Sequence, residues 1–270
     1  MPKPPVVDTH AHLTDAAFVE SMPQLLEAAR QAGLIQVGVI GFDLQSSQAA
    51  CELAAQYPSF LFASVGIQPH SAGSAAEGDW AAIRKLASHP QVRALGETGL
   101  DLYWDDTPLS VQQDFFERHI HLSSVTVLPL VIHLRASGQQ IVDQLRPHHA
   151  AGQIRGVMHS FTGDQQTCRH CLDMGLYISF AGMVTFKKSE ELRALAAYVP
   201  VDRLLVETDC PYLSPEPLRG KRPNEPARVV HTLEVIAKTR GMSYHDVAVQ
   251  TTDNAKRLFG WSDPRLAIDV

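Results

Sequence analysis

The chain has 270 residues, of which 45% are hydrophobic and 19% are charged, and its formal net charge is -6. These values are ordinary for a globular protein with a substantial core, and the length suits one large α/β domain or two small ones. The negative charge excludes a surface that binds nucleic acid through bulk positive charge. Any affinity for phosphate must therefore come from a local cluster of basic residues or from bound metal.

We expect neither a targeting segment nor a disulfide framework in this protein. The first five residues contain no apolar segment of the secretory kind, and no apolar run approaches the ~20 residues that cross a bilayer. Cys168 and Cys171 form a C-x-x-C pair in an expected helix, but no second cysteine pair completes a zinc site. We therefore expect both to pack in the core of a cytoplasmic protein with no membrane segment and no obligate protein partner.

Short apolar segments alternate with helical segments along the whole chain. Strands are expected at 6–12, 34–40, 61–67, 92–97, 130–133, 154–159, 177–180 and 203–207. Helices are expected at 22–33, 44–57, 80–88, 111–124, 139–145, 165–174, 190–198, 227–239 and 244–259. The alternation predicts a parallel sheet, and eight strands is the number that closes a barrel. We predict a single domain over residues 1–270, a (β/α)8 TIM barrel with an extra C-terminal helix; an open doubly wound sheet is the alternative.

The first strand ends in a His-x-His pair, His10 and His12. Side chains two residues apart leave a strand on the same side, so both imidazoles point into the same space. Two converging imidazoles provide half of a divalent-metal site. An isolated pair is more often one core histidine and one solvated histidine, so the ends of the other strands decide between the two interpretations.

Other side chains that can bind metal follow four further strands. They are Glu97, His133, His159, and the pair Glu207 and Asp209. In a TIM barrel these strand ends meet at the C-terminal mouth, where such enzymes place their chemistry. A histidine that only filled space there would cost stability relative to Leu or Val unless it were paired. The set as a whole therefore predicts a metal centre.

Short motifs stand at these strand ends, in the order Asp8-Thr9-His10-Ala11-His12, Gly96-Glu97-Thr98-Gly99-Leu100-Asp101, His133-Leu134-Arg135, His159-Ser160-Phe161-Thr162-Gly163 and Glu207-Thr208-Asp209. Together with Pro211-Tyr212-Leu213 they resemble the TatD-type metal-dependent deoxyribonuclease family, a branch of the amidohydrolase-like TIM barrels. The resemblance covers essentially the whole chain. It departs at one place, where the family commonly has Gly-x-His-Pro-His and this chain has Gly66-Ile67-Gln68-Pro69-His70. Gln68 therefore changes a substrate or proton contact and leaves the metal ligands intact.

The resemblance implies two divalent metal ions that share one carboxylate. His10, His12 and Asp209 would hold one ion with Glu97, and His133 and His159 would hold the second, again with Glu97. A bridging carboxylate keeps two ions ~3.5–4 Å apart, the separation used in two-metal hydrolysis. Many related barrels use a carboxylated lysine instead; Glu97 at this place favours the nuclease branch. Four imidazoles suit Zn, Fe or Ni, whereas the resemblance implies Mg or Mn in activity.

The expected function is that of a metal-dependent deoxyribonuclease with exonuclease-like action. A hydroxide between the ions would attack phosphorus, and the positive charge left at the centre suits a phosphodiester anion. Asp209 or Glu207 takes the proton, and Glu207 alternatively orients a ligand histidine. The concave mouth favours single-stranded or end-accessible DNA. The alternatives are hydrolysis of a small amide, ester or lactone at the same centre, and a metal-binding scaffold that has lost activity.

Residues around the mouth supply the expected substrate contacts. His70, Arg135 and Arg222 are candidate substrate-binding residues, and Lys187, Arg219 and Lys221 extend the basic cluster for phosphate. Tyr103 and Phe161 could stack on a base, although Phe161 could instead fill space beside the ligands. Asp8 lies on the same strand face as His10 and either contacts the ligands or serves as a structural acid.

Overall fold

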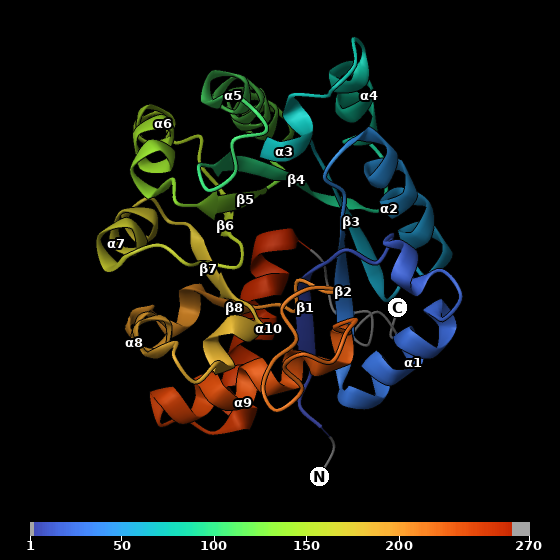
Figure 1. The fold of residues 1–270 in the computed structure, drawn as a ribbon, viewed down its shortest axis with the longest axis vertical. Helices are drawn as coiled ribbons and strands as arrows, with labels where there is room; N and C mark the ends of the chain where they lie inside the picture. The colour runs from blue at the N-terminus through green and yellow to red at the C-terminus, as the bar shows by residue number, and fades with distance from the viewer. Residues whose placement is uncertain (1–2, 261–270) are drawn as a thin grey trace, which may run out of the picture.

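Eight parallel strands lie in sequence order around a barrel (Figure 1). In the computed structural model, which describes residues 3–260, the strands are β1 (Val6–Ala11), β2 (Leu34–Ile40), β3 (Leu61–Val65), β4 (Val92–Asp101), β5 (Leu130–Arg135), β6 (Gly156–Met158), β7 (Tyr177–Phe180) and β8 (Leu204–Val206). Ala11 of β1 pairs in parallel with Cys210, just beyond β8, so the last strand meets the first. The predicted barrel is confirmed, and the open doubly wound sheet is wrong.

Helices cover the outside of the barrel between successive strands (Figure 1). They are α1 (Met22–Ala32), α2 (Leu44–Gln56), α3 (Pro69–Ala72), α4 (Asp79–Leu86), α5 (Leu109–Thr126), α6 (Gly138–Ala150), α7 (Gln165–Asp173), α8 (Glu190–Tyr198), α9 (Val229–Arg240) and α10 (Tyr244–Phe259). Short 3-10 turns are η1 (Ala16–Phe18), η2 (Gly182–Thr185), η3 (Val201–Arg203) and η4 (Pro226–Arg228). Among the described residues, no helix combines the length and apolar character that crossing a membrane requires. Cys168 and Cys171 of α7 are buried in the core, as expected.

Strands β4 and β5 run further than the sequence predicts, so Glu97 and His133 lie inside the strands and not at their last residues. Gly99 explains the difference, because it has a positive φ of 133° and pairs directly with His133. A Cβ atom at Gly99 would lie 2.2 Å from the carbonyl oxygen of His133. Gly99 therefore allows a close approach of two backbones, and this approach brings His133 beside Glu97.

Helix α6 continues past Pro147, where the sequence predicts its end. Proline inside a helix removes one backbone hydrogen bond. The residues around Pro147 are exposed, so water can hydrate the carbonyl group that loses its partner. Proline therefore costs little at this position, and one more turn forms.

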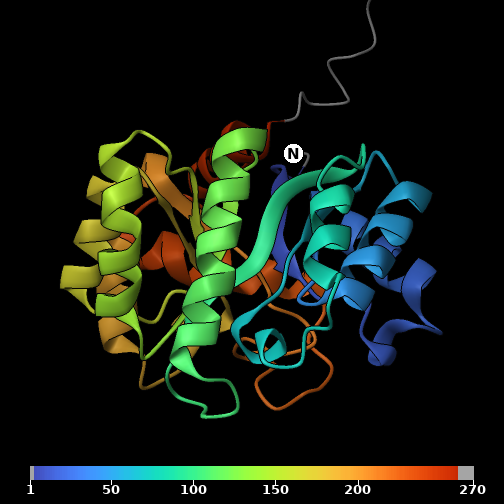
Figure 2. The same ribbon diagram turned by 90° about the horizontal axis from the view of Figure 1, so that it is seen from above.

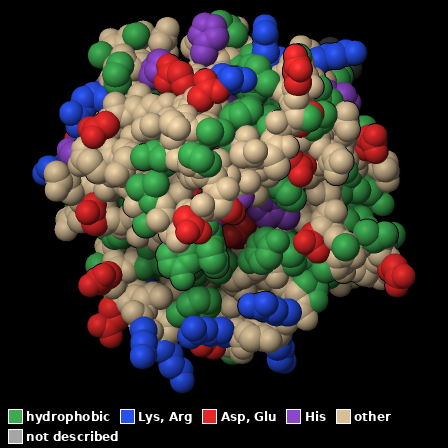
Figure 3. Space-filling view, turned by 45° about the horizontal axis from the view of Figure 1, so that its top comes forward, with side chains coloured by type: hydrophobic (Ala, Val, Ile, Leu, Met, Phe, Trp, Pro, Cys, Tyr) green, Lys and Arg blue, Asp and Glu red, His purple; other side chains and the backbone are tan. Residues whose placement is uncertain are grey.

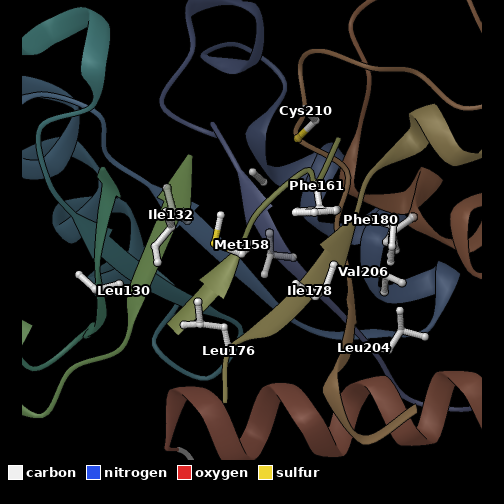
Figure 4. Close-up of a cluster of buried hydrophobic side chains, with 14 of the residues drawn as sticks. Leu130, Ile132, Met158, Phe161, Leu176, Ile178, Phe180, Leu204, Val206 and Cys210 are labelled. Atoms are coloured by element: carbon white, nitrogen blue, oxygen red, sulfur yellow. The ribbon is translucent and has the colours of Figure 1, made fainter. Parts of the chain in front are cut away.

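The extra C-terminal helix closes one end of the barrel. Ala255, Leu258 and Phe259 of α10 pack in one apolar cluster with residues near the starts of the strands, among them Val7 and Val131. The close-up in Figure 4 shows a helix beneath the strands on this side. The loops that follow β3, β4 and β8 lie at the other end, away from the N-terminus (Figure 2). Among the described residues, α10 thus covers the end of the barrel where the strands begin and leaves the other end uncovered.

Candidate metal centre

The carboxylate of Glu97 lies between two pairs of imidazoles. Its Oε2 atom is 3.6 Å from His10 Nε2 and 3.7 Å from His12 Nε2. Its Oε1 atom is 2.9 Å from His133 Nδ1 and 3.2 Å from His159 Nε2. Each carboxylate oxygen therefore faces its own pair of ring nitrogens, contributed by strands from opposite parts of the chain.

Asp209 completes the group around His10 and His12. Its Oδ1 atom lies 3.7 Å from His10 Nε2 and 3.4 Å from His12 Nε2. Asp209 has a left-handed backbone with φ 54°, and its N–H donates to the carbonyl of His10 at 2.9 Å. Aspartate tolerates this conformation better than most residues. The turn after β8 thereby directs the carboxylate back toward β1.

Asp8 holds this turn through hydrogen bonds to Thr208. One carboxylate oxygen accepts from the Thr208 N–H at 2.9 Å, and the other accepts from the Thr208 hydroxyl at 2.5 Å. Burial raises the pKa of Asp8 to about 8. Asp8 therefore joins β1 to the residue preceding Asp209, which accounts for an acid on this strand face.

The ring nitrogens that point away from Glu97 decide whether the cluster fits metal ions. Three of these outward nitrogens face a carbonyl or carboxylate oxygen: His12 Nδ1 and Ile40 O at 3.3 Å, His133 Nε2 and Asp101 Oδ2 at 2.9 Å, and His159 Nδ1 and Glu207 Oε1 at 3.3 Å. An imidazole that donates outward keeps a lone pair on its other nitrogen, directed inward. This is the tautomer in which histidine binds metal. The donor set therefore fits divalent ions on both sides of Glu97.

Glu207 is fully buried and does not line the open cavity. Its Oε1 atom accepts from His159 Nδ1 and from the Ser160 N–H, the latter at 2.7 Å. Its Oε2 atom lies 3.5 Å from the Thr9 hydroxyl. With these contacts Glu207 is placed to hold the His159 ring rather than to meet a substrate.

Burial and charge act in opposite directions on the pKa values of Glu97 and His159. Burial alone would raise the pKa of Glu97, but contacts with His159, His10 and His133 hold this pKa well below its usual value. Burial alone would lower the pKa of His159, whereas Glu97 and Glu207 raise it well above the usual value. Burial lowers the pKa of His10, and repulsion by His159 adds to the effect. The carboxylates thus favour positive charge between them, which protons or metal ions can supply.

A cavity of about 810 Å³ opens over the cluster. This volume lies within the range of about 300–1,000 Å³ that is usual for ligand sites. In Figure 3 the hollow contains acidic and histidine side chains, and Lys and Arg side chains gather along one edge of the same face. The cavity is lined by Gln68 and His70 after β3, by Arg135 and Arg222, and by Trp104 and Tyr212. Arg135, Arg222 and His70 thus lie where the sequence places them, whereas Lys187, Arg219 and Lys221 are exposed but do not line the cavity.

The prediction that Phe161 stacks on a base is wrong. Its side chain is only 1% exposed and lies in the main apolar core. The chain turns at Ser160, which has φ 42°, and the Phe161 N–H then bonds to Ser179 O on β7 at 2.9 Å. Figure 4 shows the ring among apolar side chains such as Phe180 and Cys210. Phe161 therefore fills space beneath the cluster, the alternative role considered for it.

Two aromatic residues and one acid of the site were not identified from the sequence. Asp101 contacts His133, Trp104 lines the cavity, and the Tyr212 ring lies edge-on to His12 at 6.1 Å between centroids. Asp101 and Tyr212 are part of the motifs described above, and this membership is the feature of the sequence that could have identified them. Nothing in the sequence marks Trp104 as a site residue, except that it lies shortly after Asp101, the acidic residue at which β4 ends.

Comparison with known proteins supports the same chemistry. A family model described as "TatD related DNase" matches residues 7–260. An uncharacterized metal-dependent hydrolase of Bacillus subtilis, YabD, is 39% identical, covering 93% of this chain and 98% of that protein. The "3'-5' ssDNA/RNA exonuclease TatD" of Erwinia tasmaniensis is 33% identical over the same shares of the two chains. The crystal structure of YJJV, a TatD homologue from Escherichia coli, superposes with a TM-score of 0.89 at 25% identity, covering 95% of this chain and 98% of that one.

The resemblance seen in the motifs is thus confirmed over nearly the full length of the described chain. The chain belongs to the TatD related DNase family and is a metal-dependent hydrolase.

Proposed function

We propose that this protein hydrolyses phosphodiester bonds at the ends of single-stranded DNA, with two divalent metal ions as cofactors. The observation that carries the proposal is the placement of Glu97, whose two oxygens face separate pairs of imidazoles at 2.9–3.7 Å. His10, His12 and Asp209 would hold one ion, and His133 and His159 the other, with Glu97 shared between them. All six side chains come from one chain, so the centre needs no partner protein.

The bound ions would supply Lewis acidity, which lowers the pKa of water to about 7 and stabilises charge on the phosphate oxygens. Asp209 lines the cavity and would accept the proton of the attacking water. Glu207 holds the His159 ring through its outward nitrogen and does not reach the cavity. The geometry thus favours Asp209 over Glu207 as the general base.

Arg135 and Arg222 line the cavity and would bind the phosphates that flank the scissile bond. They supply the local positive charge that a chain of net charge -6 needs. Gln68 lines the same cavity, at a position where the family pattern has a histidine. Its amide can hydrogen-bond a phosphate but cannot transfer a proton, so Gln68 would bind substrate only.

The Erwinia relative is named a 3'-5' exonuclease on single-stranded DNA and RNA, which supports a strand end as the substrate here. Magnesium or manganese would serve in activity, with zinc, iron and nickel as other ions that the imidazoles can bind. We place the protein in the cytoplasm, since its four cysteines are unpaired and buried and disulfides mark oxidising compartments.

The test is an assay of metal-loaded protein on end-labelled single strands of DNA, with Mg, Mn and Zn compared. Wild type should shorten the strand, and Glu97→Ala should cleave it more than about 100-fold more slowly. Mutation of residues that only support a metal ligand already lowers metal affinity or activity by about 10–100-fold, so loss of the shared ligand should cost more. The control is Glu190→Ala, which changes an exposed residue at the start of α8 and should keep full activity. Full activity of Glu97→Ala would overturn the bridging role. Turnover of small esters with none on DNA would overturn the choice of substrate.

A further inference from the structure

A pair of exposed aromatic side chains stands at the edge of the cavity, in the loop that follows β4. Tyr103 is 60% exposed and Trp104 is 52% exposed, and their rings meet edge-on with centroids 4.9 Å apart. The Arg135 guanidinium lies over the Tyr103 ring at 4.0 Å and 5.6 Å from the Trp104 ring centre. We refer to Tyr103, Trp104 and Arg135 as the aromatic shelf. Two large aromatic rings left in water beside a polar cavity point to a ligand that covers them.

The loop that carries Tyr103 and Trp104 is held by hydrogen bonds at both ends. Asp101 Oδ1 accepts from the N–H groups of Tyr103 and Trp104 at 2.9 and 3.2 Å. The buried Gln112 side chain accepts from the Asp101 N–H and donates to the carbonyls of Asp101 and Thr107 at 2.8–3.0 Å. The aromatic rings are therefore exposed on a fixed backbone and are not simply the ends of a loose loop.

The position of the shelf is tied to the metal centre. The same Asp101 that holds the loop contacts His133 through its second oxygen at 2.9 Å. Trp104 and Arg135 line the cavity together with His133 and Glu97. A ligand that fills this cavity and reaches the centre thus also lies along Trp104 and Arg135.

Only some ligands match this arrangement. Flat aromatic faces beside a guanidinium bind a flat, π-faced group that adjoins negative charge. In an intact duplex the base faces are already stacked on one another, so they are not free to cover the rings. An unpaired nucleobase next to a backbone phosphate has both required properties.

We propose that the aromatic shelf is a stacking subsite for an unpaired nucleobase of the strand whose phosphate lies at the metal centre. The subsite rests on the proposed function and adds a specificity determinant to it. Stacking accepts every base, so the subsite selects for unpaired nucleotides and not for sequence.

The test compares two end-labelled single strands that differ only in their bases. One is an oligothymidylate, and the other is the same strand with tetrahydrofuran spacers in place of the two terminal nucleosides. KM and kcat are measured with manganese-loaded protein, and equilibrium binding of both strands is measured by fluorescence anisotropy in EDTA, where no turnover occurs. The variants are Trp104→Ala, Tyr103→Ala and Trp104→Phe, with Tyr198→Ala, an exposed tyrosine on α8, as the matched control.

Wild type and Tyr198→Ala should bind the strand with bases about 5- to 150-fold more tightly, and this preference should appear in KM. Trp104→Ala and Tyr103→Ala should raise KM for that strand toward the value for the spacer strand, while kcat changes by less than about twofold. Trp104→Phe should retain most of the preference. Equal affinity of wild type for the two strands, or an undiminished preference in Trp104→Ala, would overturn the subsite. Preferential binding without cleavage would instead overturn the proposed function and leave the subsite standing.

Discussion

Asp101 Oδ2 accepts a hydrogen bond from His133 Nε2 at 2.9 Å, which leaves the Nδ1 atom of His133 directed at Glu97. Contacts with His133 and the backbone of Trp104 and Tyr103 outweigh burial and lower the pKa of Asp101 to about 2. The carboxylate therefore stays ionised and fixes both the tautomer and the orientation of the imidazole.

Asp101→Asn should weaken metal binding on the His133 side of Glu97 by about 10–100-fold and leave the His10 side nearly unchanged. The asparagine oxygen can still accept from the backbone N–H groups, so its NH₂ group would face His133 Nε2 and could not accept that proton. Titration with manganese by calorimetry resolves the two sites. Asp105→Asn, which changes an exposed acid of the same loop, serves as control. Two unaltered sites in Asp101→Asn would contradict the role of this hydrogen bond.

The two acids after β8 should give different kinetic defects. Asp209→Asn should lower kcat by more than about 100-fold at saturating manganese, as expected when a general base is lost. Glu207→Gln should raise the manganese concentration needed for half activity by about 10–100-fold, with a kcat loss below about tenfold. Rates measured across a manganese series separate these effects. The opposite pattern would make Glu207 the base.

Gly99→Ala should destabilise the fold by more than the strain of its backbone angle alone. The new Cβ would lie 2.2 Å from the His133 carbonyl oxygen, and overpacking of this kind typically costs about 1–3 kcal/mol. Gly78 is the matched control, because it also has a positive φ but has no atom within 4 Å of the Cβ position. Denaturant unfolding of both alanine variants measures the difference. Equal stability of the two would show that β4 and β5 can separate at little cost.

Stability should depend on pH through His119, which packs behind the loop after β3. Its Nδ1–H donates to Phe115 O at 2.7 Å, and its Nε2 accepts from the Ile67 N–H at 3.1 Å. Burial, with a smaller contribution from the Arg118 charge, lowers the pKa of His119 from 6.5 to about 4. The unfolded chain thus binds more protons between these values, so this contribution is complete above pH 6.5 and is lost as pH falls to 4.

His119→Gln removes this titration and should destabilise the protein at pH 7. The free-energy difference between wild type and variant should then shrink by about 3 kcal/mol as pH falls from 6.5 to 4. Urea unfolding at four pH values across this range measures it. A difference that does not vary with pH would show that the folded protein protonates His119 normally.

The parts of the site that are local in sequence were predictable. The spacing of His10 and His12 on one strand fixes their common direction, and the motifs brought Glu97, His133 and His159 to the same barrel end. In a closed barrel the carboxyl ends of all strands lie at the same mouth. Once eight strands are recognised in the sequence, the residues at their ends are therefore expected to be neighbours in space.

Residues whose role depends on where a strand ends were harder to predict. The sequence predicts a fourth strand over 92–97, which leaves Asp101 outside it, whereas the strand continues to Asp101. Phe161 was placed at the mouth, but one left-handed residue, Ser160, turns the chain and sends the ring into the core. Such turns are set by contacts with neighbouring strands and leave little trace in local periodicity.

The central claim is that Glu97 holds a divalent ion with each of its oxygens. Anomalous diffraction from crystals soaked in manganese tests it most directly. The account predicts two manganese peaks about 3.5–4 Å apart, one beside His10 and His12 and the other beside His133 and His159. A single peak, or peaks that do not contact Glu97, would contradict it.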